Sequence, residues 1–229
     1  MAQRAGVHQA TASRALNAAS RHLVNAATAE RVLAAARELG YVPNAIARGL
    51  RTSRTGTVGV IIPDLTNPLF PPIVRGIEDV LAAAGYTALL ANTDNDERRE
   101  RAQFGALITR RVDGFIVATA RREHPLLAEA ARRGAKVVLV NRSTESADFS
   151  AVTADDALGI TLAVRHLVEL GHTRIGHLSG PPTLSTGATR ARAFAEALRS
   201  FGLDALPGAV VPVDAYTEAA GALATRELL

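Results

Sequence analysis

The sequence contains no cysteine and no tryptophan, and aromatic residues make up only 4% of its 229 positions. A chain without cysteine has no disulfides, no thiolate metal ligands and no cysteine nucleophile, which is typical of a cytoplasmic protein. The shortage of aromatic rings disfavours stacking as the main means of binding. No apolar run reaches the roughly 18 residues that a membrane-spanning helix needs, and residues 1–16 lack the unbroken apolar core of a secretory signal. We therefore expect a cytoplasmic protein without a membrane segment.

Motifs that define common enzyme classes are missing as well. The chain has no G-x-G-x-x-G or G-x-x-x-x-G-K-[ST] phosphate loop and no G-x-S-x-G nucleophile elbow. Its single lysine, Lys136, falls inside a predicted strand. We expect no catalytic residues and no cofactor.

Two sets of polar residues can be interpreted as functional or as structural. His166, His172 and His177 are spaced by six and five residues, so they do not share a helix face, and structural roles are favoured over a metal site. Asp155 and Asp156 look like paired catalytic carboxylates, but acidic residues at a helix start are more commonly caps and partners of the helix dipole. We expect no metal site.

The composition, 48% apolar and 21% charged, is typical of a globular protein. The charged residues are distributed unevenly along the chain. Residues 1–55 carry eight arginines and two acidic residues, a net charge of +6, whereas residues 56–229 carry 18 basic and 20 acidic residues. A basic N-terminal part on a near-neutral body indicates binding to a polyanion, although a solvated helical region would have the same composition.

The periodicity of apolar residues predicts two different architectures. The first 42 residues form helices, one of which covers 29–39 with Asn25 before it and Gly40 after it as caps. From Thr57 onward, β-branched runs alternate with amphipathic stretches, which predicts an α/β fold with a doubly wound parallel sheet. The predicted strands are 57–62, 87–91, 114–118, 136–140, 151–153, 174–178 and 209–213, and the predicted helices lie near 71–84, 97–111, 124–133, 156–170, 188–201 and 215–229.

Several motifs, in order along the chain, point to one family. Residues 6–17, GVHQATASRALN, have the turn glycine and the small, polar or basic side chains of a helix that enters a major groove, a pattern that other short polar helices also match. Residues 43–50, PNAIARGL, are more specific because a basic linker and the first strand follow them directly. The chain here resembles the LacI/GalR (lactose-repressor) family of bacterial transcription regulators. The resemblance continues through residues 56–68, 75–78, 111–116, 138–142 and 166–181.

The resemblance implies that a homodimer binds palindromic, double-stranded operator DNA through a helix-turn-helix head. It places Gln9, Ala10 and Arg14 where recognition-helix residues face base edges. It assigns phosphate contacts to Thr11, Ser13, Asn17, Asn25 and Thr28. It also places Ala47 and Leu50 on a hinge helix in the minor groove, with Leu50 as the apolar wedge that opens a base step.

The resemblance further implies a cleft between two lobes of the periplasmic-binding-protein type, where a small-molecule effector binds. The matching positions follow predicted strands and comprise Asn67, Leu69, Phe70, Asn141, Arg142, Thr186 and Arg190. Amides, a hydroxyl and guanidinium groups beside one aromatic ring favour a sugar over a planar base. Without the family, Phe70 would be assigned to the core and Arg190 to a solvated surface.

The chain also departs from the family pattern. Most of the helix that precedes the turn is missing, His8 stands where the family has a serine N-cap, and the C-terminal lobe is incomplete. The predicted division is a head at 1–42, a hinge and linker at 43–55, an N-terminal lobe at 56–154 and a partial C-terminal lobe at 155–229.

Two other classes of protein share part of this pattern but would need features that the sequence lacks. A sugar-binding transport protein would share the two-lobed fold, but it would carry an export signal in place of the basic head. A Rossmann-type enzyme would need the missing phosphate loop. The sequence therefore predicts a transcription regulator, most simply a repressor, whose operator affinity a small molecule controls.

Overall fold

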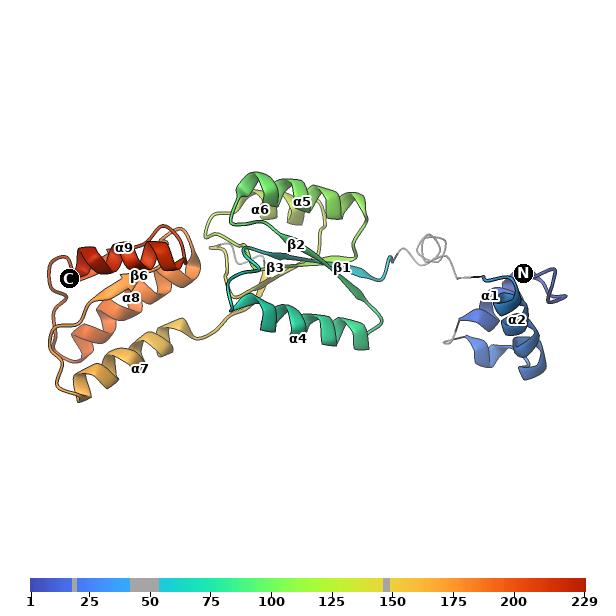
Figure 1. The fold of residues 1–229 in the computed structure, drawn as a ribbon, viewed down its shortest axis with the longest axis horizontal. Helices are drawn as coiled ribbons and strands as arrows, with labels where there is room; N and C mark the ends of the chain where they lie inside the picture. The colour runs from blue at the N-terminus through green and yellow to red at the C-terminus, as the bar shows by residue number, and fades with distance from the viewer. Residues whose placement is uncertain (18–19, 42–53, 146–148) are drawn as a thin grey trace. The chain divides into compact units, whose positions relative to one another are not determined.

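The computed structural model describes residues 1–17, 20–41, 54–145 and 149–229, which belong to two compact units, Met1–Thr55 and Gly56–Leu229 (Figure 1). Across these ranges, every helix falls short of the length and apolar character that a bilayer crossing requires.

The N-terminal unit is built on helices whose apolar faces consist largely of alanine. Helix α1 covers Gln9–Leu16, a 3-10 helix covers Arg21–Leu23, and α2 covers Ala26–Glu38. Small side chains at a helix contact allow the backbones to approach closely, so two short helices can share one core. That core comprises Ala5, Ala12, Ala15, Ala29, Val32 and Ala35.

Both helices begin at a side-chain cap. His8 Nδ1 accepts a hydrogen bond from the Ala10 amide at 3.2 Å, so the histidine does cap α1 even though serine would be the better residue. Asn25 Oδ1 accepts from the Ala27 amide at 3.0 Å, as the sequence predicted. Gly40 follows α2 with a φ of +58°, a conformation that favours glycine.

The residues ahead of α1 form a single turn. The Ala5 amide donates to the carbonyl of Met1 at 3.0 Å, and Met1 and Ala2 pack against the alanine core. Arg4 pairs with Glu38 at 2.6 Å, which ties this segment to the end of α2. This turn therefore covers part of the core beside α1.

The second unit contains a five-stranded sheet in which all neighbours are parallel. The strand order is β2-β1-β3-β4-β5, so β1 lies inside and the chain winds outward from it in two directions. This is the doubly wound arrangement that the alternation of strands and helices predicted. The strands are β1 (Thr57–Ile62), β2 (Thr87–Asn92), β3 (Gly114–Val117), β4 (Val137–Val140) and β5 (Ser150–Val152).

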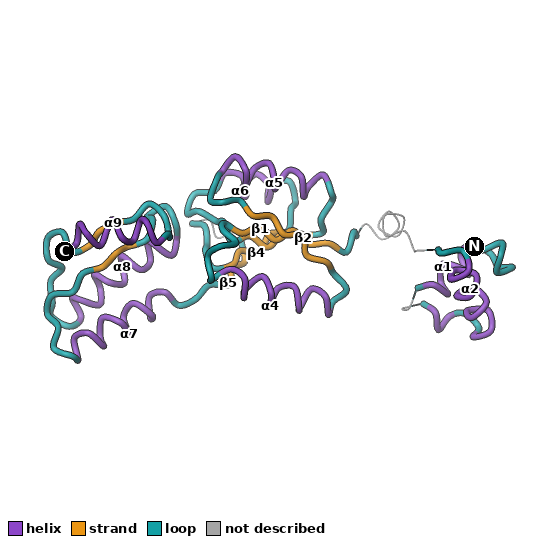
Figure 2. Tube along the Cα trace, in the orientation of Figure 1, coloured by secondary structure: helices purple, strands orange, loops and turns teal. Residues whose placement is uncertain are grey.

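Helices cover both faces of this sheet, which explains why its strands are apolar on both sides. Helix α4 (Phe70–Ala83) lies on one face, and α5 (Glu97–Thr109) and α6 (Pro125–Arg132) lie on the other (Figures 1 and 2). A Cβ on Gly59 would lie 2.9 Å from Leu107 Cδ1, so glycine at this position lets α5 approach β1.

A smaller α/β layer follows and forms what we call the C-terminal lobe, the five-stranded part being the N-terminal lobe. Strands β6 (His177–Ser179) and β7 (Val210–Pro212) pair in parallel. Helices α7 (Asp156–Glu169) and α8 (Ser185–Ser200) pack together through Val164, Phe194 and Leu198. The last helix, α9, covers Glu218–Leu228.

The strands and helices predicted between residues 57 and 229 form, but several boundaries in the C-terminal lobe differ. The strand predicted at 174–178 begins at His177, because β6 pairs with β7 over only three residues of each strand. The helix predicted at 188–201 begins three residues earlier, at Ser185. The helix predicted at 215–229 begins only at Glu218, where the Thr217 hydroxyl caps it by accepting from the Ala220 amide at 3.2 Å.

We expect Phe104→Ala to lower the free energy of unfolding of the second unit by roughly 3–5 kcal/mol. Phe104 is 1% exposed and stacks on Phe115 with ring centroids 4.3 Å apart, so the substitution leaves a cavity between α5 and the sheet. Ile108→Ala, at a half-exposed position in the same helix, should change stability by about 0.5 kcal/mol or less. Urea unfolding followed by circular dichroism measures both, and equal effects would show that the Phe104 site repacks freely.

Candidate ligand cleft and nucleic-acid interface

The residues predicted to read bases lie on the solvent face of α1. Ala12 and Ala15 are buried, whereas Gln9, Ala10 and Arg14 are exposed. An α-helix has about 3.6 residues per turn. With this period, the two buried alanines lie on one side of α1, and Gln9, Ala10 and Arg14 lie on the opposite side. The arrangement leaves the predicted base-reading side chains accessible to a partner.

The predicted phosphate contacts are spread over the same unit. Ser13 is exposed on α1, Thr11 and Thr28 are half-buried, and Asn25 is exposed although its side-chain oxygen caps α2. Asn17 stands at the C-terminal end of α1. The hinge positions Ala47 and Leu50 lie outside the described residues.

Two side chains hold the C-terminal end of α1. The Ser20 hydroxyl donates to the Arg14 carbonyl at 3.2 Å, and Arg21 Nε donates to the Ala15 carbonyl at 2.9 Å. Helix-end carbonyls have no partner within the helix itself, so these contacts satisfy groups that water would otherwise solvate. The exposed face of α1 is thereby presented on a helix that is fixed at both ends.

In the second unit, the seven predicted effector residues line one cavity of about 130 Å³, which we call the Arg190 chamber. They come from the segment after β1, the segment after β4, and α8. Tyr216, which follows β7, completes the lining. The complete set is Asn67, Leu69, Phe70, Asn141, Arg142, Thr186, Arg190 and Tyr216.

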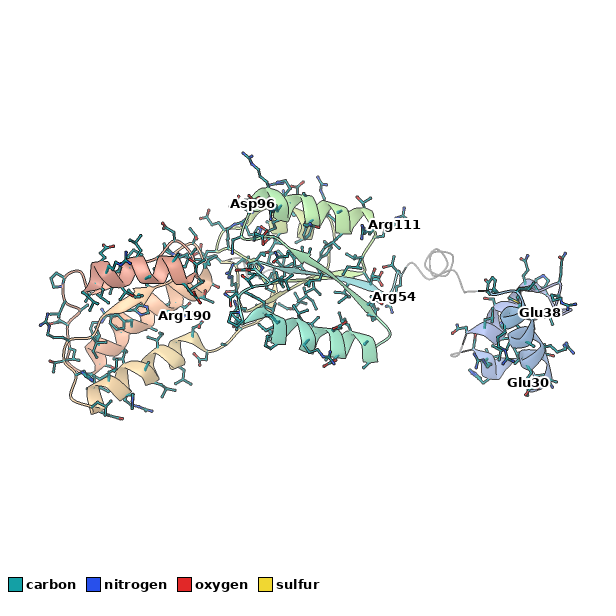
Figure 3. The ribbon with its side chains drawn as sticks, viewed as in Figure 1. Glu30, Glu38, Arg54, Asp96, Arg111 and Arg190 are labelled. Carbon is teal, nitrogen blue, oxygen red and sulfur yellow. The ribbon has the colours of Figure 1, made fainter. Side chains whose placement is uncertain are left out.

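Arg190, labelled in Figure 3, is held in place before any ligand binds. Its Nε lies 2.7 Å from Asp156 Oδ1, and its guanidinium carbon lies 5.8 Å from the centre of the Tyr216 ring. Asp156 is therefore the partner of a cleft residue, whereas Asp155 caps α7 by accepting from the Leu158 amide at 2.9 Å. Arg190 thus occupies one face of the Tyr216 ring.

Tyr216 reaches its position because glycine stands opposite it. The Tyr216 hydroxyl lies 3.1 Å from Thr186 Oγ1, and a Cβ on Gly180 would overlap that hydroxyl. A Cβ on Gly187 would likewise collide with the Pro181 carbonyl, so the loop after β6 can approach the start of α8. Glycine is therefore required at 187, where the close neighbours are backbone atoms, and at 180 it leaves room for the Tyr216 side chain.

Arg142 is the buried cation of the cleft. The residue is 6% exposed, and among the described residues its Nε has no hydrogen-bond partner. Burial lowers the pKa of the Arg142 guanidinium, although it stays protonated because an arginine pKa starts far above neutrality. A buried donor without a partner destabilises the empty site and favours a ligand that brings an acceptor.

A second cavity of about 170 Å³ adjoins the first, and we call it the Asp214 chamber. It shares Asn67, Phe70, Arg142 and Tyr216 with the Arg190 chamber. Most of its other polar lining residues follow β1, β2, β3 and β7, and these are Asp64, Thr93, Thr119, Arg121 and Asp214. The Thr66 hydroxyl and amide, which donate to Asp64, lower the pKa of that carboxyl.

A buried ion network supports the wall of the Asp214 chamber. Glu100 is 2% exposed and accepts from the Thr119 hydroxyl and from Arg121 at 3.2 Å. His124 Nδ1 accepts from the Arg121 amide at 3.3 Å, and His124 Nε2 lies 3.3 Å from Glu100 Oε2 and 3.2 Å from Arg121 NH2. Burial raises the pKa of the Glu100 carboxyl, but hydrogen bonds from His124 and Thr119 outweigh this and hold it below its ordinary value.

Three hydrogen bonds, together called the clasp, join the two lobes beside the chambers. The Arg122 amide donates to the Thr183 carbonyl and its NH1 donates to the Pro182 carbonyl, both at 3.0 Å. The Ser143 amide donates to the Ser185 hydroxyl oxygen at 2.9 Å. The loop after β6 is thereby fixed to the loops after β3 and β4.

The other described titratable groups of the second unit are spread over that unit. Within the described ranges, no three His, Asp or Glu side chains are grouped so that they could hold a metal ion. The ring of His177 stacks on Phe194 at 4.8 Å, and burial, followed by the charge of Arg190, lowers its pKa. His177 thus packs against α8 through its ring.

The sequence interpretation missed Tyr216, Arg121 and Asp214 as cleft residues. A signal for them was present, because each follows the end of a predicted strand, as Asn67 and Asn141 do. The carboxyl ends of parallel strands meet at one edge of a sheet. A rule that examined the segment after every predicted strand would have included all three.

Two family models match the chain. The model of bacterial regulatory proteins of the lacI family matches residues 1–44. The model of periplasmic binding proteins and the sugar-binding domain of the LacI family matches residues 55–229. Together they account for the basic head and for the lobes that line the cleft.

Individual proteins agree with both models. The chain is 32% identical over 229 residues to the HTH-type transcriptional repressor CytR of Escherichia coli strain K12, all of this chain and 66% of CytR being covered. A structure of the regulator CelR with cellobiose is 31% identical, with a TM-score of 0.69, and covers 100% of this chain and 68% of that one. The structure of the lac repressor dimer bound to operator and an anti-inducer has a TM-score of 0.80 at 26% identity. The match covers 96% of this chain and 66% of the lac repressor chain.

We expect Arg142→Met to leave the free energy of unfolding unchanged or to raise it by about 1 kcal/mol, because it removes a buried charge that lacks a partner at Nε. Arg122→Met is the matched control. It removes a hydrogen bond to the Pro182 carbonyl and an ion pair with Glu145, so it should lower stability by roughly 1 kcal/mol. Thermal and urea unfolding measure both, and a large loss for Arg142→Met would mean that its guanidinium stabilises the empty cleft.

Proposed function

Because the chain belongs to the LacI family of bacterial regulatory proteins, we propose that it represses transcription by binding operator DNA under the control of a small-molecule effector, a sugar. The observation that carries this proposal is the convergence of all seven predicted effector residues on one cavity, in a chain that also has a basic helical head. The match to a lacI-family head favours a regulator over a transport protein of the same two-lobed fold.

The proposed DNA complex is a homodimer on a palindromic operator in the cytoplasm. Gln9, Ala10 and Arg14 read base edges in the major groove, and the polar residues around α1 and α2 hold phosphates. Ala47 and Leu50 belong to the hinge in the minor groove, where Leu50 acts as the wedge. The exposed face of α1, the charge of the head and the dimeric, operator-bound relative support this assignment.

The sugar assignment is supported by the chemistry of the Arg190 chamber. Its polar groups are amides, a hydroxyl and two guanidinium groups, which suit a ligand rich in hydroxyls. Phe70 is 1% exposed and packs in the core, and Arg190 already occupies one face of the Tyr216 ring, so the aromatic surface left for a planar base is small. A related regulator has been determined with cellobiose bound.

We expect Arg14→Ala to weaken binding to a DNA site by about 1–3 kcal/mol and to relax preference at one position of each half-site. The site is first selected from a random library with the unmodified chain, and affinities are then measured by gel shift at fixed salt. Arg37→Ala, which removes an exposed arginine from α2, controls for the loss of positive charge. If Arg14→Ala weakens all sequences equally, Arg14 contacts phosphate and does not read a base.

We expect Arg190→Ala to weaken binding of the effector about 10- to 150-fold, because a ligand acceptor would lose its donor. Calorimetry against sugar and nucleoside panels measures this, and DNA affinity without effector should stay unchanged. Arg192→Ala is the control, since Arg192 lies two residues away with 68% of its side chain exposed. A normal response of Arg190→Ala, or tight binding of a purine by the unmodified chain, would contradict the assignment.

A further inference from the structure

One residue, Arg122, makes two of the three hydrogen bonds of the clasp. Its amide donates to the Thr183 carbonyl and its NH1 donates to the Pro182 carbonyl, both at 3.0 Å. The first of these bonds joins two backbone groups, so it forms only when the Arg122 amide points toward the C-terminal lobe. Whatever orients the backbone at residue 122 therefore controls the clasp.

The preceding amide, that of Arg121, is held inside the N-terminal lobe. It donates to His124 Nδ1 at 3.3 Å, and the side chain of His124 is fully buried. The amides of Arg121 and Arg122 belong to adjacent peptide planes that are joined through one Cα atom. A rotation that takes the first amide away from His124 therefore also turns the second amide away from the Thr183 carbonyl.

The ring of His124 is fixed through both its backbone and its side chain. Pro125 follows it, and a residue before proline is kept out of the helical conformation, as the φ of −136° and ψ of 81° of His124 show. In the ring, Nε2 lies 3.3 Å from Glu100 Oε2, and Glu100 is itself buried and accepts from the Thr119 hydroxyl. The acceptor Nδ1 thus has a defined position against which the Arg121 amide is placed.

We propose that His124 is the positioning residue of the clasp. Its Nδ1 holds the Arg121 amide within the N-terminal lobe and thereby directs the Arg122 amide to the Thr183 carbonyl. Without this acceptor the part-buried Arg121 amide has no partner, so the segment turns to satisfy it and withdraws Arg122 from the C-terminal lobe. This role requires neither DNA nor an effector, so it is independent of the proposed function.

Two substitutions separate the roles of the two ring nitrogens. In His124→Asn, the side-chain oxygen takes the place of Nδ1 and accepts from the Arg121 amide, whereas the contact with Glu100 is lost. In His124→Gln, the longer side chain places its amide group near the position of Nε2, so the contact with Glu100 is kept and the acceptor for the Arg121 amide is lost. Both variants lose a buried ring, so their melting temperatures should fall by similar amounts.

Hydrogen exchange of single amides, measured by NMR on the 229-residue chain, tests the proposal. The Arg122 amide should exchange about five- to tenfold faster in His124→Gln than in the unmodified chain, and it should stay slow in His124→Asn. The internal reference is the Ala118 amide, which donates to the Ile61 carbonyl at 2.8 Å within the larger sheet. Its exchange rate should be the same in the two variants.

The unmodified chain provides a second measurement that does not depend on the folding of a variant. If His124 couples the two amides, those of Arg121 and Arg122 become accessible in the same opening event. Their free energies of opening should then be equal and should fall in parallel as urea is added. An Arg122 amide that opens independently of the Arg121 amide would overturn the proposal.

Two outcomes with the variants would also overturn it. If the Arg122 amide stays slow in His124→Gln, Nδ1 contributes nothing to the clasp. If it exchanges equally fast in His124→Asn and His124→Gln, the ring supports the segment only by filling space, and the acceptor has no separate role. Neither outcome would bear on operator or effector binding, so the proposed function would stand.

Discussion

The parallel direction of the strands is the constraint on which the cleft depends. Because all five strands of the larger sheet run the same way, the segments that leave β1, β2, β3 and β4 emerge along one edge. The same holds for β6 and β7 in the C-terminal lobe. Polar residues separated by up to 150 positions in the chain thereby line two adjoining chambers, and an antiparallel strand at any of these places would send its segment to the opposite edge.

Much of this arrangement was predictable from the sequence. All seven parallel strands and the helices between them follow from apolar runs and amphipathic periods. The reason is clearest for β1 and β3, which lie inside the larger sheet and have no exposed residue. The family resemblance placed Asn141, Thr186 and Arg190 within one cavity. Their role in binding remains a prediction.

What escaped prediction depends on contacts between different elements of the C-terminal lobe. The local pattern at 155–156 explained both acids as helix-start residues, and both are, since Asp155 caps α7 and Asp156 lies in its first turn. The pattern did not predict that Asp156 also pairs with Arg190 on α8. Tyr216 lies in the cleft because Gly180 leaves room for its hydroxyl. Neither relation has a signature in sequence spacing, because the partners belong to different elements whose distance is set by packing.

The clasp between the lobes sets an energy scale for any movement of the cleft walls. Its three hydrogen bonds, made by Arg122 and Ser143, contribute roughly 1 kcal/mol each, or about 3 kcal/mol together. A molecule supplies less than this free energy if its affinity for a form with separated lobes is less than about 150-fold higher than its affinity for the form with joined lobes. Such a molecule leaves the lobes joined. The cleft thus has a built-in threshold, and weakly discriminating molecules can occupy it without changing its shape.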